Sequence, residues 1–248
     1  MRTKRFTLLA AMILTIATTF SVNMLTASPA AADACYTWSR TLSSGMSGSD
    51  VTQLQKRIAG WVSYGENLAL DGQYGPATTA AVKRFQSGYG LSVDGIAGSQ
   101  TFSKLYALQD DDCTPIHFSH YEMNNNCGAH NYDGGAVSAA TAKENALRVM
   151  WQLEAVRHKL GDRAMVVTSG FRSYACNSSV GGSSTSNHLY GRAADLGTAS
   201  GPTLCEIDKA GRYAGFEEIL GPGYPGHSDH AHLANQGSQY WSASNCGI

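Results

Sequence analysis

Two short segments of this 248-residue chain gather histidine and aspartate, side chains that commonly bind catalytic metal ions. The first segment contains His188 and Asp195, and the second runs from His227 to His232 and includes Asp229. Zinc in hydrolytic sites usually takes three protein ligands and leaves a fourth position for water. A lone histidine would more often be structural. Because the two segments occur together, they indicate a hydrolytic metal centre.

Spacing alone leaves the ligands of the second segment open. His230 and His232 alternate along an expected strand, and alternate residues of a strand face the same side. Either ring, or both, could therefore reach a metal ion. We interpret His230 as a structural residue or as one that supports a ligand.

The residues around the first segment resemble a long and specific signature, S-x-H-x-x-G-x-A-x-D. Its fixed positions are occupied by Ser186, His188, Gly191, Ala193 and Asp195. This is the signature of the zinc D-Ala-D-Ala carboxypeptidases of peptidase family M15, which also include the vancomycin-resistance dipeptidases. Downstream, Asp229 and His232 resemble the (D/E)-x-x-H pair of the same family.

The resemblance implies roles for individual residues. His188, Asp195 and His232 would bind one Zn2+ ion per chain. Asp229 stands where related dipeptidases have a glutamate that acts as general base, and His227 resembles a histidine thought to assist catalysis. Either of these last two could be the main proton-transfer group.

Arg172 follows an expected strand, residues 164–168, and resembles the family arginine that holds the substrate. Its guanidinium fork suits a terminal carboxylate, which is the group that an exopeptidase must recognise. From the residue type alone, a surface arginine is an equal alternative. With the resemblance, we expect Arg172 to bind substrate.

The N-terminus has the layout of a cleaved secretory signal. Arg2, Lys4 and Arg5 precede an apolar stretch, residues 6–20, and small residues follow up to Ala32. We predict cleavage after Ala32, secretion to the extracellular space or the cell wall, and no membrane attachment afterwards. A membrane anchor is the alternative, but polar residues interrupt the apolar stretch near its end.

All six cysteines follow the expected cleavage site, and none forms a C-x-x-C pair. In an exported chain this predicts three disulfides, and six cysteines allow fifteen connectivities. Spacing does not choose among them. The order in the resembling family implies the pairs Cys35 with Cys113, Cys127 with Cys176, and Cys205 with Cys246.

The pattern D-G-x-x-G-x-x-T begins at Asp71 and again at Asp94. Asp-Gly favours a turn, and apolar residues at helical spacing follow each copy. An amphipathic segment, residues 50–58, begins with Asp50 as its expected N-cap. Together these features predict a small three-helix bundle whose glycines and aspartates shape turns. With the V-x-x-L-Q and V-x-x-F-Q motifs, they also resemble a peptidoglycan-binding domain over residues 38–108.

The C-terminal part has the pattern of an α+β domain. A capping-box spacing at Thr141 and apolar residues at helical spacing predict a long helix that stops at Gly161. Short apolar runs predict strands over residues 164–168, 193–196, 216–220 and 230–233. The fold class is therefore α+β: a small N-terminal three-helix bundle, then a zinc peptidase domain with a mainly antiparallel sheet.

An acidic run ending at Cys113, followed by Pro115, marks the expected boundary between the two parts. We predict a signal peptide over residues 1–32, a peptidoglycan-binding domain over 33–109 and a catalytic domain over 110–248.

The expected partners are peptidoglycan and D-Ala-D-Ala-terminated peptides, with the enzyme acting as a monomer. The net charge of −1 becomes more negative when the basic signal segment is lost, so nothing indicates a nucleic-acid partner. The resemblance implies hydrolysis of the terminal D-Ala-D-Ala bond of stem peptides, with release of D-alanine; D,D cross-links with a free carboxylate would be a second substrate.

Two alternatives keep the metal site. A zinc wall endopeptidase of the same superfamily is disfavoured by Arg172, because an internal bond offers it no carboxylate. A non-catalytic wall-binding protein with structural zinc is disfavoured by Asp229 and His227, because a closed structural site needs no base.

Overall fold

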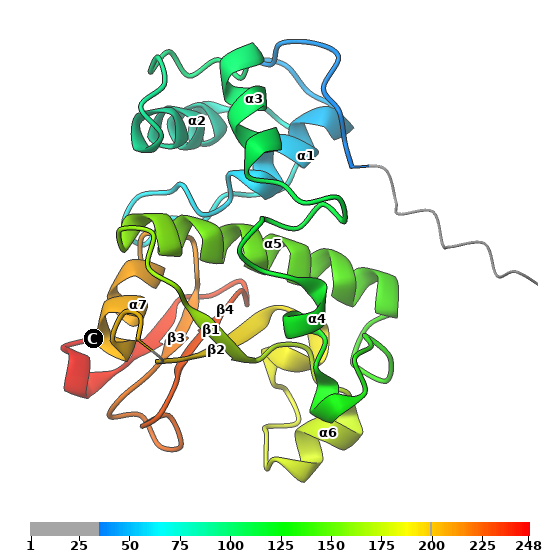
Figure 1. The fold of residues 1–248 in the computed structure, drawn as a ribbon, viewed down its shortest axis with the longest axis vertical. Coiled ribbons are helices and arrows are strands. Elements are labelled where there is room, and N and C mark those ends of the chain that lie inside the picture. The colour runs from blue at the N-terminus through cyan, green and yellow to red at the C-terminus, as the bar shows by residue number, and fades with distance from the viewer. Residues whose placement is uncertain (1–34, 199) are drawn as a thin grey trace, which may run out of the picture. The chain divides into compact units, whose positions relative to one another are not determined.

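Helices form the first part of the chain in the computed structural model, which describes residues 35–198 and 200–248 (Figure 1). They are α1 (Ser49–Arg57), α2 (Pro76–Gly88) and α3 (Ser99–Ala107). The expected N-cap of the first helix is wrong. Gly48 occupies the cap position, and Asp50 lies in the first turn, where its carboxylate accepts from Arg40 Nε at 2.6 Å. Asp50 therefore lies inside the helix, two residues after the cap position.

The expected signal peptide, residues 1–32, lies outside the described residues. Within residues 35–198 and 200–248, no helix combines the length and apolar character needed to cross a membrane.

Two buried glutamines explain the repeated motif. The amide of Gln55 donates to Asp71 Oδ1 and accepts from Gly72 N. One copy later, Gln86 makes the same contacts with Asp94 Oδ1 and Gly95 N. The two glycines have φ of +70° and +75°, which a residue with a Cβ adopts only with strain. The repeat therefore fastens each turn to the helix before it, in agreement with the expected turn role.

The second part of the chain is built around a long helix, α5 (Ala139–Lys159). Ser138 is its N-cap and accepts from Thr141 N, so the cap expected at Thr141 lies three residues too late. Gly161 follows the helix with φ +76°, as expected of a stop. The other helical segments are α4 (His120–Met123), α6 (Tyr174–Ser179), α7 (Leu204–Gly211) and the 3-10 turns η1 (Asn126–Gly128), η2 (Asn187–Tyr190) and η3 (Ser244–Cys246).

In the described part of the chain the strands form one five-stranded sheet of order β1-β2-β4-β3-β5. They are β1 (Val166–Ser169), β2 (Ala193–Gly197), β3 (Glu218–Leu220), β4 (Ala231–Ala234) and β5 (Tyr240–Ser242). All pairs are antiparallel except β3 with β5, so the α+β class with a mainly antiparallel sheet is confirmed. The edge strand β5 was not predicted, because it lies outside any apolar run of strand length.

The helix α5 contacts α1 on one side and the elements β2 and α7 on the other (Figure 1). Gly60, which follows α1, lies so close that a Cβ there would approach Ala155 Cβ to 2.5 Å. Arg57 is 1% exposed and its guanidinium lies over the rings of Trp38 and Trp151. The described residues thus form one compact unit, and the boundary at 109/110 stays a prediction.

The three disulfides join Cys35 to Cys113, Cys127 to Cys176, and Cys205 to Cys246. The pairing implied by the family order is therefore confirmed, and no cysteine is free. The first disulfide closes the helical part, and the other two lie within the part that carries the sheet.

Candidate metal centre

Three side chains converge beside the sheet. Ligand atoms of His188, Asp195 and His232 all lie within 4.8 Å of one another. His188 Nε2 is 3.1 Å from Asp195 Oδ1 and 3.2 Å from His232 Nδ1, and His232 Nδ1 is 2.8 Å from Asp195 Oδ1. Each residue is at most 5% exposed. Two imidazoles and a carboxylate that face one point form a donor set that suits zinc.

Strand pairing brings the two distant segments of sequence together. β2 and β4 are antiparallel, with Asp195 directly opposite His232. Directly opposed residues of an antiparallel pair point to the same face. Asp195 and His232 therefore reach the same point although 37 positions separate them in the sequence.

Local structure accounts for the rest of the signature. Ser186 is the N-cap of η2 and its hydroxyl accepts from His188 N, so it sets the start of the turn that carries the histidine. Gly191 ends this turn with φ +68°, and a Cβ there would lie 2.4 Å from Ala142 O. Ala193 is fully buried opposite Ala234. These small residues let the turn pack on α5 and the strand enter the sheet.

The charges of the cluster depend on one another. Burial alone would raise the pKa of Asp195, but His188 and His232 hold it well below its usual value. Burial lowers the pKa of His188 despite the nearby carboxylate. For His232, burial is outweighed by hydrogen bonds to Asp195 and Glu218, which raise its pKa to about 9. An ionised carboxylate between two imidazoles attracts a cation.

Each histidine also holds its second ring nitrogen in a hydrogen bond. His188 Nδ1 donates to Gly170 O at 2.5 Å, and His232 Nε2 lies 3.3 Å from Glu218 Oε2. Glu218 accepts from Asn187 Nδ2 as well. Sequence reasoning missed Glu218 and Asn187, because the first lies in a strand remote from any motif and the second is a variable position of the signature.

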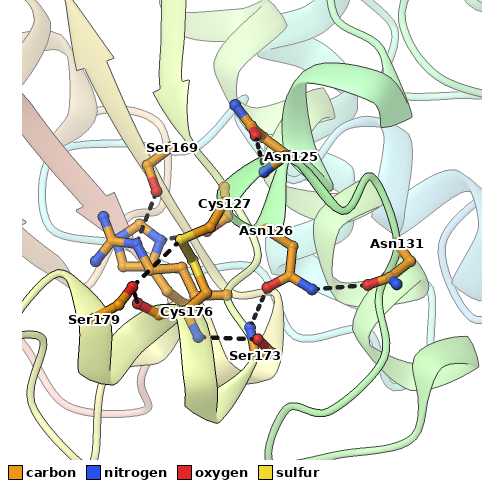
Figure 2. The surroundings of a disulfide bond; sticks show 12 residues. Asn125, Asn126, Cys127, Asn131, Ser169, Ser173, Cys176 and Ser179 are labelled. Carbon is orange, nitrogen blue, oxygen red and sulfur yellow. Dashed lines mark hydrogen bonds between the residues drawn. A yellow bond between two sulfur atoms is a disulfide. The ribbon is translucent and has the colours of Figure 1, made fainter.

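Arg172 lies at the edge of the cluster. Its Nη2 donates to Asp195 Oδ2 at 2.5 Å and its Nε donates to Ser169 Oγ at 2.9 Å. The following residue, Ser173, caps α6 and donates its N–H to Asn126 Oδ1 at 2.7 Å. Figure 2 shows the contact between Ser173 and Asn126 beside the disulfide that joins Cys127 to Cys176. The disulfide thus joins α6, which follows Arg172 in the sequence, to the turn η1 that contacts Ser173.

Two adjoining hollows share Arg172, Asp195 and His230. The larger is a cleft of about 560 Å³ that also contains His188, Glu218, His227 and His232. The smaller, of about 330 Å³, lies on the side of the disulfide Cys127–Cys176. A substrate in the cleft would therefore meet the three converging side chains and the arginine together.

Of the remaining expected site residues, His227 lines the cleft, whereas Asp229 is not among the residues that line it. His227 donates from Nδ1 to Pro225 O at 3.0 Å, and burial lowers its pKa, so its Nε2 is unprotonated near neutral pH. Asp229 has an 86% exposed side chain and accepts from His230 Nδ1 at 2.9 Å. His230 Nε2 in turn lies 3.8 Å from Asp195 Oδ1. Among the described residues, His230 links Asp229 to the cluster.

Sequence comparison places the chain among known proteins. A relative from Streptomyces albus G, named zinc D-Ala-D-Ala carboxypeptidase, is 58% identical over 218 residues, which cover 88% of this chain and 84% of the relative. The chain belongs to the peptidase M15 family. The family's model matches residues 116–234, which include the metal cluster and Arg172.

Further matches cover smaller shares of the chain. A model described as a putative peptidoglycan-binding domain matches residues 47–105. An N-acetylmuramoyl-L-alanine amidase of Bacillus licheniformis is 48% identical over 67 residues, which cover 25% of this chain and 19% of the amidase. Among solved structures, a Burkholderia AP3 phage endolysin is 32% identical, covers 44% of this chain and 36% of its own, and has a TM-score of 0.26.

Proposed function

We propose that this chain is a secreted zinc peptidase that hydrolyses the C-terminal D-Ala-D-Ala bond of peptidoglycan stem peptides and releases D-alanine. The observation that carries the proposal is the convergence of His188, Asp195 and His232 in a cleft that also holds Arg172. Membership of the M15 family and the relative from Streptomyces albus G support it.

His188, Asp195 and His232 would hold one zinc ion per chain. The fit rests on the donor atoms, because each ring turns one nitrogen toward Asp195 and keeps the other in a separate hydrogen bond. Zinc in this position acts as a Lewis acid and brings the pKa of water toward neutrality.

Arg172 would bind the terminal carboxylate of the substrate. Within the described residues, its Nε and Nη2 have protein partners, and no hydrogen bond engages Nη1. The guanidinium therefore has a free donor, and Arg172 lines both hollows. This selects a peptide bond next to a free carboxylate and disfavours the endopeptidase alternative.

His227 and Asp229 would move protons during hydrolysis. The unprotonated Nε2 of His227 is able to take a proton and later return it to the leaving amine. The hydrogen bond with His230 lowers the pKa of Asp229, so this carboxylate is ionised at neutral pH and able to act as a base.

The remaining proposals concern the whole chain. Residues 1–32 would be a signal peptide, 33–109 a peptidoglycan-binding domain and 110–248 the catalytic domain of an extracellular or cell-wall-associated monomer. The match of residues 47–105 to a putative peptidoglycan-binding domain supports a role in holding the enzyme on its substrate.

The test is release of D-alanine from diacetyl-Lys-D-Ala-D-Ala by the purified chain without residues 1–32. We expect release that a chelator abolishes and added zinc restores, and no release from the same peptide with an amidated C-terminus. Bound zinc without any release would contradict the carboxypeptidase function and favour a structural zinc. Cleavage of the amidated peptide would favour an endopeptidase.

A further inference from the structure

Glu218 lies on the same face of the sheet as the metal cluster. β3 and β4 are antiparallel with Leu220 opposite His232, and β4 and β2 place His232 opposite Asp195. Side chains two positions apart on a strand share a face. Glu218 therefore points to the side where Asp195 and His232 meet, although no signature residue lies near it in the sequence.

One carboxylate oxygen of Glu218 joins the two ligand-bearing segments. Glu218 Oε2 accepts from Asn187 Nδ2 at 2.5 Å and lies 3.3 Å from His232 Nε2. Asn187 immediately precedes His188 in the turn η2. The side chain of Glu218 is 19% exposed and that of His232 is 7% exposed, so water competes weakly for these contacts.

The two histidines are held differently. The second nitrogen of His188 donates to the backbone oxygen of Gly170, which no side-chain substitution removes. The second nitrogen of His232 depends on the side chain of Glu218. A ring with one nitrogen anchored cannot turn over, so the other nitrogen keeps facing Asp195.

We propose that Glu218 is a positioning residue of the metal centre: it fixes the ring of His232 with Nδ1 toward the metal and, through Asn187, holds the turn that carries His188. The inference rests on the proposed zinc site. Loss of the Glu218 side chain weakens zinc binding 10- to 100-fold, which is the usual effect of removing a residue that hydrogen-bonds to a metal ligand.

The experiment measures zinc affinity of Glu218→Ala, Glu218→Gln and Asn187→Ala by competition with a chromophoric chelator. Glu217→Gln is the matched control, because Glu217 is adjacent in sequence but accepts from the backbone N–H groups of Gln236 and Gly237. We expect a 10- to 100-fold higher zinc dissociation constant for Glu218→Ala and a smaller increase for Glu218→Gln, whose amide oxygen still accepts from His232. The control should stay within about twofold of the parent.

A second readout separates positioning from general loss of structure. Cobalt-loaded Glu218→Gln should show a changed visible absorption spectrum, because the uncharged amide is a weaker acceptor than the carboxylate and makes His232 a weaker ligand, while the metal-free variant unfolds in urea like the parent. If Glu218→Ala does not fold, Glu218→Gln decides the question.

Unchanged zinc affinity and cobalt spectra in both Glu218 variants would overturn the inference, including the case in which activity alone is lost and Glu218 acts on substrate. If the parent chain binds no zinc, the proposed function fails as well. If the parent binds zinc and releases D-alanine while the Glu218 variants match its zinc affinity, only the positioning role is wrong.

Discussion

At the residue scale, Arg172 affects metal binding and substrate binding in different ways. It neutralises Asp195 through Nη2, and it is proposed to bind the substrate carboxylate. Removing a positive charge beside an ionised ligand leaves the cluster more attractive to a cation. Substrate binding and metal binding should therefore respond in opposite directions to the same substitution.

We expect Arg172→Ala to lower kcat/KM for the D-Ala-D-Ala peptide about 10- to 100-fold, mainly through KM, because a charge-assisted hydrogen bond of about 1.5–3 kcal/mol is lost. The kcat/KM of Arg172→Lys should lie between the values of the parent and of Arg172→Ala. Steady-state kinetics with zinc content measured on the same samples provides the test. Unchanged KM in Arg172→Ala would exclude the carboxylate-binding role.

Asp208 is a second residue with an unusual charge state. It is fully buried in α7, its Oδ1 has no hydrogen-bond partner among the described residues, and burial raises its pKa to about 7. The folded chain therefore holds this proton between about pH 4 and pH 7 while the unfolded chain releases it. Stability contributed by the protonated form is present below pH 4 and decreases as pH rises to about 7.

In metal-free protein, Asp208→Asn should remove this decrease and raise the free energy of unfolding at pH 8 by at most about 4 kcal/mol, with little change at pH 4. Urea unfolding at the two pH values measures the difference. The exposed Asp111→Asn serves as control. A gain of equal size at both pH values would mean that the carboxyl does not carry a raised pKa.

At the element scale, backbone conformation at Gly191 sets the turn that carries His188. The φ of +68° and the nearby Ala142 O both exclude a Cβ. Gly90 follows α2 with almost the same φ, +66°, but has open space around it. Comparing substitutions at Gly191 and Gly90 therefore separates the cost of backbone strain from the cost of steric overlap with α5.

Gly90→Ala should cost about 1–2 kcal/mol of stability, from the left-handed backbone alone. Gly191→Ala should cost clearly more and should also weaken zinc binding, because the turn must move away from Ala142. Urea unfolding and chelator competition test both effects. Equal destabilisation by the two substitutions would show that contact with α5 does not hold the turn.

At the scale of the whole molecule, the helical part and the sheet-bearing part share an interface on α5. Lys56 pairs with Glu144, and Arg148 Nη2 donates to Asn67 Oδ1 at 2.8 Å. The φ of Gly60 is not positive, so a glycine is needed there only because Ala155 of α5 lies so close. The interface should make the two parts unfold together.

Gly60→Ala should destabilise the chain by about 1–3 kcal/mol through overpacking against Ala155. Gly75→Ala meets nothing within 4 Å and only replaces the N-cap glycine of α2, so it should cost less, roughly 0.5–1 kcal/mol. Thermal unfolding followed by calorimetry tests this, and the parent should show one transition. Two transitions in the parent would contradict a tight interface.

The proposed wall retention also belongs to the scale of the whole molecule. A chain that begins at Thr114 omits both Cys35 and Cys113 and so leaves no unpaired cysteine. We expect it to release D-alanine from the soluble peptide, to be less stable because α5 loses its cover, and to sediment poorly with sacculi. Retention equal to that of the full chain would show that the helical part does not bind the wall.

The sequence by itself determined what depends on residue type and local spacing. Histidines and aspartates in two clusters indicated the metal donors, apolar periodicity indicated the helix up to Gly161, and Asp-Gly repeats indicated turns. The M15 signature added the expected ligand set and the cysteine pairing. These signals are local because caps, turns and helical faces involve residues a few positions apart.

Tertiary structure alone decided which distant residues meet. Strand register set Asp195 opposite His232 and brought Glu218 to the second nitrogen of His232. Register depends on packing between segments far apart in sequence, which no local pattern encodes. The structure also decided between two candidate caps of α5: Ser138 and Thr141 both have cap-forming side chains, and the helix begins after Ser138.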